Sequence, residues 1–575
     1  MKPNKNQYLY LIALLLLSGT SCNKYLNQAP QTSLTDASFW KTTADLQTGC
    51  NYLYYSLPNY GGTPTEDFQS DIAYGGSPNP TSSGTRNAPV SDGSWQNNYI
   101  LIFNANNILQ KSTTVSGVDS VIQKFQGEAR FFRAFAYYEL VKRYGDVPYT
   151  DRIIGVDGDT LLYASRTNRE TIIDSIYADL DFAAAHCPQP DVQPTADYGR
   201  ITATAALAFK SRVALFEGTW DKFHGGGDAN KHLQIAATAA KAVIDGHKYS
   251  LYTGQADSSY YYEFLYDGGL AGNPPFNPSA RPEKNYTYAT NKENILLSLY
   301  GVSVSSLIRN HAFTSTYFNR SNFCGTRAIT DQYLFSDGLP EGKSGYDSTY
   351  KATSSLTEFR NRDPRFGMTF LNKTDFVGIG NYFLPTYFYS IRKFCTTGDV
   401  GQYGNACFNN YNAIRYAEVL LNYAEATFEL SSSIDDADLN LTINALRQRA
   451  WGSQFSQSLM LTNAFVASNG LDMRTEIRRE RSVELALEGF RYWDLLRWKT
   501  AETELPKPLL GPQFFAAENP SLSPPPTVNA NGFSVLQSGV GANIRQFDPT
   551  RDYLFPIPTQ QILLEKGKLT QNPKW

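Results

Sequence analysis

The chain has 575 residues and a formal net charge of −3, which leaves room for one large core or two fused subdomains. The nearly balanced charge lacks the electrostatic signature of a nucleic-acid partner or of a basic surface that binds membranes. Aromatic residues make up 14% of the chain, and its 38 tyrosines suit either core packing or half-exposed binding surfaces.

The N-terminal segment has the pattern of a secretory signal. Lys2 and Lys5 precede a short apolar run at residues 8–17, and the small residues SGTS then lead directly to Cys22. The run is too short to stay as a membrane-spanning anchor. Because the segment resembles a lipoprotein signal, we predict a signal peptide at residues 1–21, lipidation at Cys22 and an extended tether at residues 22–34. The alternative is an ordinary secreted protein in which Cys22 occurs by chance.

Residues 35–250 show mainly helical periodicity. We expect Asp36 to cap a first helix that runs through residues 50–57, followed by a loop at residues 61–92. Further helices are expected at residues 95–110, 169–186, 201–218 and 232–245. The last two are Ala-rich and joined by a flexible segment, a pairing that favours a tetratricopeptide-like stack, although the spacing is irregular.

A helix packed on several sides is predicted within residues 127–149, which read GEARFFRAFAYYELVKRYGDVPY. Phe125, Phe132 and Leu140 lie on one apolar stripe, and further rings widen this stripe to most of the circumference. Gly145 and Pro148 end the helix, since glycine permits a turn and proline cannot continue the hydrogen-bond ladder.

The composition and the expected secondary structure change twice in the C-terminal half. Residues 251–410 are rich in aromatic residues, Gly and Asn, with short strand-like runs such as residues 295–300. Helices are expected again at residues 411–430, 437–450 and 474–498, before a Pro-rich and Gly-rich excursion. Two of the six cysteines, Cys395 and Cys407, are placed to bridge a loop, but whether they pair is left open.

Charged residues recur at intervals of three at the end of the last expected helix. Glu488, Arg491, Asp494 and Arg497 have the spacing of helix-surface ion pairs, and Gly489 is a candidate interruption. Apolar residues surround them on all sides, so we expect some of the pairs to be buried. We interpret the four as structural, with catalytic carboxylates as the alternative.

Catalytic and metal-binding motifs are absent from the sequence. Residues 338–344 miss a phosphate-binding loop by one residue, and no strand and helix frame them. The five histidines have no compact metal-ligand spacing, and no serine lies in a GxSxG elbow. No carboxylate pair is marked for glycoside hydrolysis. We therefore predict no catalytic residue, no metal ligand and no cofactor, and whether a structural metal is bound is left open.

Several segments resemble those of one family, in the order in which that family carries them. The stretch at residues 127–149 is similar to the signature helix of the SusD/RagB family, and TEIRRERSVELALEGFRYWDLLRW at residues 475–498 is similar to its C-terminal signature. Shorter matches are NRDPRF, IRYAEVLLNYAEA, NALRQRA, YLFPIP and QNPKW, at residues 361–366, 414–426, 444–450, 553–558 and 571–575. Together they cover nearly the whole chain.

The resemblance implies a mainly α fold, a tetratricopeptide-like helix-pair scaffold with long irregular loops and a few short strands. It implies one SusD-like domain at residues 35–575, with scaffold at 35–250 and 411–500 and loop-rich ligand-side insertions at 251–410 and 501–550. The implied function is that of a non-catalytic, lipid-anchored protein at the surface of the outer membrane. Such a protein captures a glycan and delivers it to a SusC-like TonB-dependent transporter.

The resemblance also points to candidate ligand contacts. Trp95 and Asn98 are three residues apart on one expected helix face and resemble a Trp and an Asn that the starch-binding prototype uses. Asp71 and Arg86, in the preceding loop, fall near its charged contacts, and Tyr317 is a fainter candidate. Trp95 is equally well explained as a packed ring at a helix start, and the two charges as solvated loop residues.

Three other functions stay open. A peptide or another non-sugar nutrient is the alternative ligand for the same type of transporter. A secreted glycosidase would release new reducing ends from glycans. A pure tetratricopeptide scaffold would have no affinity for small ligands.

Overall fold

The structure is a computed structural model. It describes residues 39–61, 66–155, 159–264, 291–300, 311, 323–346, 354–372, 388–394, 410–520, 522–537 and 545–575. The expected signal peptide and tether, together with Cys22, Tyr317, Cys395 and Cys407, lie outside these residues. Among the helices that the structure describes, none is long and apolar enough to cross a membrane.

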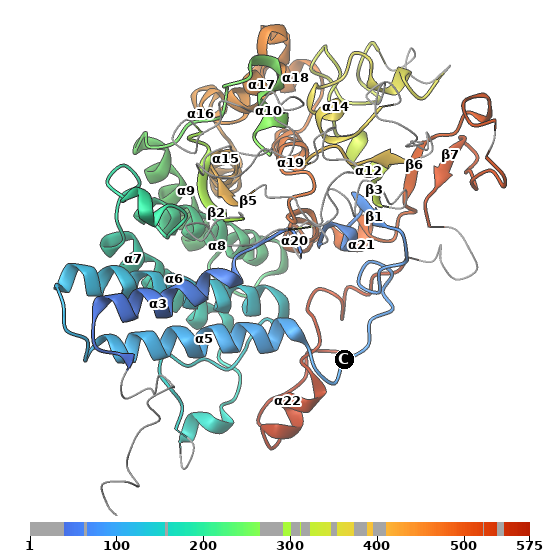
Figure 1. The fold of residues 1–575 in the computed structure, drawn as a ribbon. Helices are drawn as coiled ribbons and strands as arrows, with labels where there is room; N and C mark the ends of the chain where they lie inside the picture. Colours follow the sequence, from blue (N-terminus) through green and yellow to red (C-terminus); the bar gives the residue numbers. More distant parts are fainter. Residues whose placement is uncertain are drawn as a thin grey trace, which may run out of the picture.

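Six helices form a stack in which each packs on the next along the chain, coloured blue to green in Figure 1. Side-chain oxygens at the N-caps of most of them satisfy the first free N–H groups, as Asp92 does for α5 and Asp228 for α9. The helices are α3 (Thr43–Leu53), α5 (Gly93–Ser112), α6 (Asp119–Tyr144), α7 (Arg169–His186), α8 (Ala203–His224) and α9 (Ala229–Asp245). The predicted mainly α, tetratricopeptide-like architecture is thereby confirmed.

Helix α6 lies at the centre of this stack. Phe131 and Phe132 are fully buried, and the Phe131 ring meets that of Phe209 on α8. The helix ends at Gly145, whose φ of 73° lies in the left-handed region that glycine adopts without strain. The prediction of a helix packed on several sides is confirmed.

The bounds of two N-terminal helices differ from the expected ones. Helix α3 begins after Thr42, because Thr42 and Asp45 form a reciprocal capping box, and it ends at Leu53 rather than at residue 57; Asp36 lies outside the described residues. Helix α8 continues through the segment expected to be a flexible connection and ends only at Gly225, whose φ is 81°. Within this last stretch Trp220 stacks on His224 at 4.0 Å between ring centroids, and both rings contact Tyr553 of the C-terminal segment, at 6.5 and 4.7 Å.

Helices of the C-terminal half extend the stack. Residues 411–430 were expected to be one helix, but β5 (Tyr411–Arg415) is a strand paired antiparallel with β2 (Asn294–Ser298), and α15 (Tyr416–Ser431) follows it. Helix α15 packs on α9 and α19 (Met473–Glu484), so the two halves share one core. The expected helix at residues 437–450 is split at Thr442 into α16 (Asp436–Leu441) and α17 (Ile443–Trp451).

The second signature segment is two helices rather than one. Between α19 and α20 (Arg491–Arg497), Leu487 and Gly489 have φ values of 64° and 82°, which end the first helix and redirect the chain. Asp67, in the 3₁₀ helix η2 (Asp67–Gln69), caps the second helix by accepting hydrogen bonds from the backbone N–H groups of Gly489 and Arg491. The interruption at Gly489 is confirmed.

Short strands and helices complete the fold. Among the residues that the structure describes, three small antiparallel sheets pair β1 with β3 and β3 with β4, β2 with β5, and β6 with β7. Their remaining strands are β1 (Ala73–Gly75), β3 (Phe323–Gly325), β4 (Tyr389–Ser390), β6 (Leu510–Gln513) and β7 (Phe533–Val535). Further α-helices within the described residues are α10 (Ser259–Tyr262), α12 (Arg327–Thr330), α14 (Arg365–Thr369), α18 (Asn463–Ser468), α21 (Ala501–Glu504) and α22 (Thr559–Leu564).

A buried ionic network joins α14, α17 and α19 to strand β5. Arg415 binds Glu484 at 2.6 Å and Glu293 at 2.9 Å, while Arg365 binds Glu484 at 2.9 Å. Burial alone would raise the pKa of Glu484, but Arg449, Arg415 and Arg365 together hold it well below its usual range. The charges are therefore compensated within the core and serve to tie segments together.

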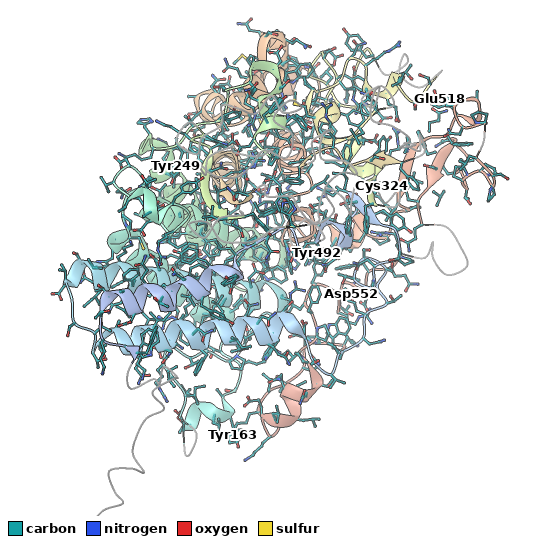
Figure 2. The ribbon with its side chains drawn as sticks, viewed as in Figure 1. Tyr163, Tyr249, Cys324, Tyr492, Glu518 and Asp552 are labelled. Atoms are coloured by element: carbon teal, nitrogen blue, oxygen red, sulfur yellow. The ribbon has the colours of Figure 1, made fainter. Side chains whose placement is uncertain are left out.

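The C-terminal segment packs back on the N-terminal half. The Arg86 guanidinium donates to the Asp552 backbone carbonyl at 2.9 Å and lies 4.2 Å from the centre of the Phe555 ring. Asn572 donates to the backbone carbonyl of Tyr144 at 3.0 Å, at the end of α6. Figure 2 shows Asp552 near Tyr492 of α20, at the same end of the helical stack.

Candidate functional site

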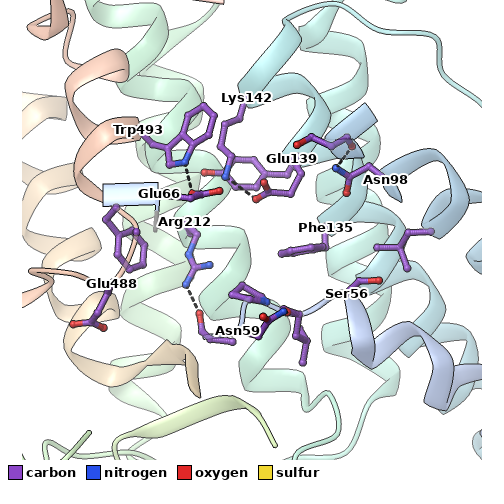
Figure 3. Close-up of a pocket in the computed structure, with 18 of the residues that line it drawn as sticks. Ser56, Asn59, Glu66, Asn98, Phe135, Glu139, Lys142, Arg212, Glu488 and Trp493 are labelled. Atoms are coloured by element: carbon purple, nitrogen blue, oxygen red, sulfur yellow. Dashed lines mark hydrogen bonds and ion pairs between the residues drawn. The ribbon is translucent and has the colours of Figure 1, made fainter. Parts of the chain in front are cut away.

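A cavity of about 540 Å³ lies where α3, α5, α6 and α8 meet α20. Figure 3 shows Asn98 and Phe135 on one side of it and Trp493 and Glu488 on the other, with Arg212 between them. The lining therefore comes from segments that are far apart in the sequence. Its size and its mixture of rings and polar groups are those of a small-ligand site.

Two exposed tyrosines are among the residues that line this cavity. Tyr52 on α3 is 60% exposed, and Tyr55 on the 3₁₀ helix η1 (Tyr54–Ser56) is 58% exposed. Their ring centroids lie 6.2 Å apart. Large exposed rings side by side are unusual on a monomer, and such a surface suits stacking against the apolar face of a ligand.

Amide side chains of α5 line the adjoining wall. Asn98 donates from Nδ2 to the backbone carbonyl of Ser94 at 2.7 Å, which fixes its orientation. Asn97 and Asn104 also face the cavity, and among the residues that the structure describes their side chains form no hydrogen bond with the protein. Each amide offers both donors and an acceptor, so this wall can recognise hydroxyl groups.

The charged groups of the lining are largely taken up by protein partners. Lys142 binds Glu139 at 2.7 Å, and Arg212 binds Glu418 at 2.6 Å. The Trp493 indole N–H donates to Glu66 at 2.8 Å. With acidic and basic side chains paired in this way, the cavity has no strong bias toward an anionic or a cationic ligand.

Trp95, one of the predicted ligand contacts, is a core residue. It is only 5% exposed, and its ring lies 5.0 Å from Tyr99 and 5.1 Å from Tyr144, measured between ring centroids. It does not line the cavity, although its neighbour Asn98 does. Of the two interpretations that the sequence left open, the geometry favours the packed ring.

Asp71 and Arg86 also lie away from the cavity, and both are buried. Asp71 accepts two hydrogen bonds from Arg491, at 2.9 and 2.8 Å; burial alone would raise its pKa, but Arg491 holds it below its usual value. Arg86 is held by Asp552 and Phe555, as described above. Neither is the solvated loop charge that the sequence offered as the alternative, and the structure does not bring them together with Asn98.

Sequence reasoning did not find the two exposed rings. They belong to the YLYYS stretch at residues 52–56, where an i, i+3 spacing of tyrosines was the available signal. The signal is weak, because the same spacing equally predicts a buried stripe. Only the packing of α3 against α5 and α6 shows which rings face outward.

Comparisons with known proteins agree with this architecture. A family model described as "SusD family" matches residues 288–575, and another, described as "Starch-binding associating with outer membrane", matches residues 24–215. SusD-like protein P2 from Formosa agariphila is 26% identical in an alignment that covers 99% of this chain and 99% of that protein.

Solved structures share the fold. The crystal structure of a SusD-like carbohydrate binding protein from Bacteroides fragilis has a TM-score of 0.70 at 22% identity and covers 92% of this chain and 99% of that chain. Surface glycan-binding protein A from Bacteroides fluxus has a TM-score of 0.59 at 20% identity and covers 93% of this chain and 100% of that chain. With a family model matching its C-terminal half and a second matching its N-terminal third, the chain belongs to the SusD family.

Proposed function

We propose that this protein binds a neutral oligosaccharide in the cavity between α3, α5, α6 and α20, without catalysis. The observation that carries the proposal is the pair of exposed rings of Tyr52 and Tyr55 beside an amide-lined wall. A sugar presents an apolar ring face that stacks on an aromatic ring and hydroxyl groups that bond to amides. The paired charges of the lining favour an uncharged glycan over a charged peptide.

The family supports a location at the outer membrane, and we propose that the binding takes place at the cell surface. One matching family model is described as associating with the outer membrane, and the two solved relatives are described as carbohydrate-binding or glycan-binding. We extend this to a lipid anchor at Cys22 and to delivery of the glycan to a SusC-like TonB-dependent transporter. Tyr317 stays a predicted ligand contact, and of the other predicted contacts Asn98 is the one that we retain.

The experiment is a binding titration of the wild-type protein across a polysaccharide panel, followed by Tyr52→Ala and Tyr55→Ala. Each substitution should weaken binding by about tenfold, since a stacked ring contributes about 1–2 kcal/mol. Their melting temperatures should hardly change, because both rings are already exposed.

Tyr346→Ala is the matched control, because Tyr346 is 38% exposed and lies outside the cavity. Unchanged affinity in both cavity variants would contradict the assigned site. An absence of wild-type affinity for every polysaccharide would favour a peptide or another nutrient as ligand. New reducing ends in the incubated glycans would identify a glycosidase instead.

A further inference from the structure

A second cluster of polar side chains lies where α7, α8 and α9 meet. Glu170 is in the first turn of α7, Asp221 in the last turn of α8 and His232 in the first turn of α9. One ligand atom from each lies within 4.8 Å of the others. His232 Nε2 is 2.9 Å from Glu170 Oε2 and 3.7 Å from Asp221 Oδ2.

Two carboxylate oxygens in this cluster have no hydrogen-bond partner among the described residues, Asp221 Oδ2 and Glu170 Oε1. The Asp221 side chain is only 2% exposed, so its unpaired oxygen carries the full cost of leaving water. The nearby guanidinium of Arg169 is engaged by Glu217, at 2.7 and 2.6 Å. A bound cation or a proton would stabilise such a buried carboxylate oxygen.

The Tyr177 hydroxyl orients the imidazole of His232 through its Nδ1 atom. Its Nδ1 lies 2.7 Å from the hydroxyl oxygen of Tyr177 on α7, and the whole side chain is buried. When Nδ1–H donates to this oxygen, the lone pair of Nε2 faces the two carboxylates. A second hydrogen bond that sets the tautomer is the usual support of a histidine that binds a metal.

The loop between α8 and α9 closes over the cluster. A Cβ added at Gly227 would lie 2.4 Å from Asp221 Oδ2 and 2.5 Å from Glu170 Oε1, so both free oxygens face this glycine. Gly225, Gly226 and Gly227 are exposed, and the Glu170 side chain is 27% exposed, which leaves a short route from solvent.

We propose that Glu170, Asp221 and His232 bind a divalent transition-metal ion, with Zn²⁺ preferred, as a structural site that clamps α7, α8 and α9. One imidazole nitrogen and two carboxylate oxygens form a ligand set that Zn²⁺ accepts, and a water completes a tetrahedron. The site is separate from the proposed glycan cavity, since none of its residues lines that cavity.

The test is a thermal unfolding curve of the full protein, stripped of metal with a chelator and then titrated with ZnCl₂. At saturating Zn²⁺ the melting temperature should rise by about 2–4 °C. Isothermal titration should give one site, and Co²⁺ in its place should give the intense visible absorption of tetrahedral coordination.

Variants assign the ligands. Asp221→Asn should fold as well as the metal-free protein and lose at least about 100-fold in Zn²⁺ affinity, while Tyr177→Phe should lose about 10–100-fold through the misoriented imidazole. His247→Gln is the control, because His247 is exposed, follows the opposite end of α9 from His232 and lies outside the cluster. Equal Zn²⁺ affinity in Asp221→Asn and wild type, or no Zn²⁺ binding at all, would overturn the proposal and leave a shared proton in the cluster.

Discussion

At the scale of single residues, Trp95 is the clearest test of whether an aromatic ring near the cavity contributes to core packing or to ligand binding. Its ring packs between Tyr99 and Tyr144, so Trp95→Ala should lower the free energy of unfolding by about 3–5 kcal/mol, the usual cost of emptying a buried aromatic site. Chemical denaturation measures this loss. Trp95→Phe should recover much of it, because a ring still fills the space.

Glycan affinity measured on the same variant, below its unfolding transition, should stay near the wild-type value. A stable Trp95→Ala protein with weakened glycan binding would instead restore Trp95 as a ligand contact, the interpretation drawn from its resemblance to the starch-binding prototype.

Glu425 makes stability depend on acid pH. Burial raises its pKa, but Arg497, at 2.6 and 2.8 Å, outweighs burial and lowers the pKa from 4.5 to about 2. Because the folded pKa lies below the unfolded one, the stabilisation is complete above about pH 4.5 and is lost as the pH falls toward 2. Over this window the loss is on the order of 3 kcal/mol.

Glu425→Gln isolates this contribution. Its cost relative to wild type should be large at pH 7 and should shrink as the pH falls from about 4.5 to 2, since wild type then protonates the same carboxyl group. Denaturant unfolding at a series of pH values measures the difference. A cost that does not change across that window would show that Glu425 is not ionised in the folded protein.

Single residues of the site were only partly predictable. Asn98 was found because a spacing of three placed it on the expected helix and the family resemblance pointed there, and it does line the cavity. The same spacing could not show that Trp95 turns inward, because a helical period tells which residues share a face and not what that face meets. The partners of Asp71 and Arg86 lie more than 400 residues away.

At the scale of elements, the break between α19 and α20 depends on Asp67. The backbone N–H groups of Gly489 and Arg491 both donate to this buried carboxylate, at 2.9 and 3.2 Å. Asp67→Ala should therefore destabilise the protein by about 1–3 kcal/mol for each N–H left unpaired. Asp67→Asn should cost less at pH 7, because burial already raises the pKa of Asp67 to about 7.

Urea unfolding of the two variants at pH 7 gives the comparison. Equal losses in Asp67→Ala and Asp67→Asn would mean that a single amide oxygen cannot replace the two carboxylate oxygens that accept from Gly489 and Arg491.

Most long helices were predictable because their apolar stripes repeat over many turns, as in α6 and α7. The errors fall where short-range periodicity carries no information. Residues 411–415 are apolar and could begin a helix, but β2, more than 100 residues earlier in the chain, pairs with them and makes them a strand. Likewise, Trp220 and His224 in the last turns of α8 pack on Tyr553, more than 300 residues later in the chain, which no local pattern records.

At the scale of the whole molecule, the fold class followed from the helical pattern and from the order of short matching segments. The site did not, because its cavity is assembled from α3, α5, α6, α8 and α20, which the sequence separates by hundreds of residues. The same holds for the cluster of Glu170, Asp221 and His232, whose spacing of 51 and 11 residues resembles no metal-binding motif. We named no metal ligand from that spacing, and the stacking of three helices is what brings the three side chains together.

The packing of the C-terminal segment on the N-terminal half also governs how the chain can acquire its structure. Arg86 reaches Asp552 across 466 residues of sequence, and Asn572 reaches Tyr144 across 428. Contacts of such separation impose a large entropic barrier on folding, and they cannot form while the chain is still emerging from a ribosome or a translocation pore. Until residues 545–575 arrive, the loop around Arg86 and the end of α6 stay uncovered. The protein therefore has an extended period in which apolar surface is open to aggregation, and the packing of residues 545–575 closes that period.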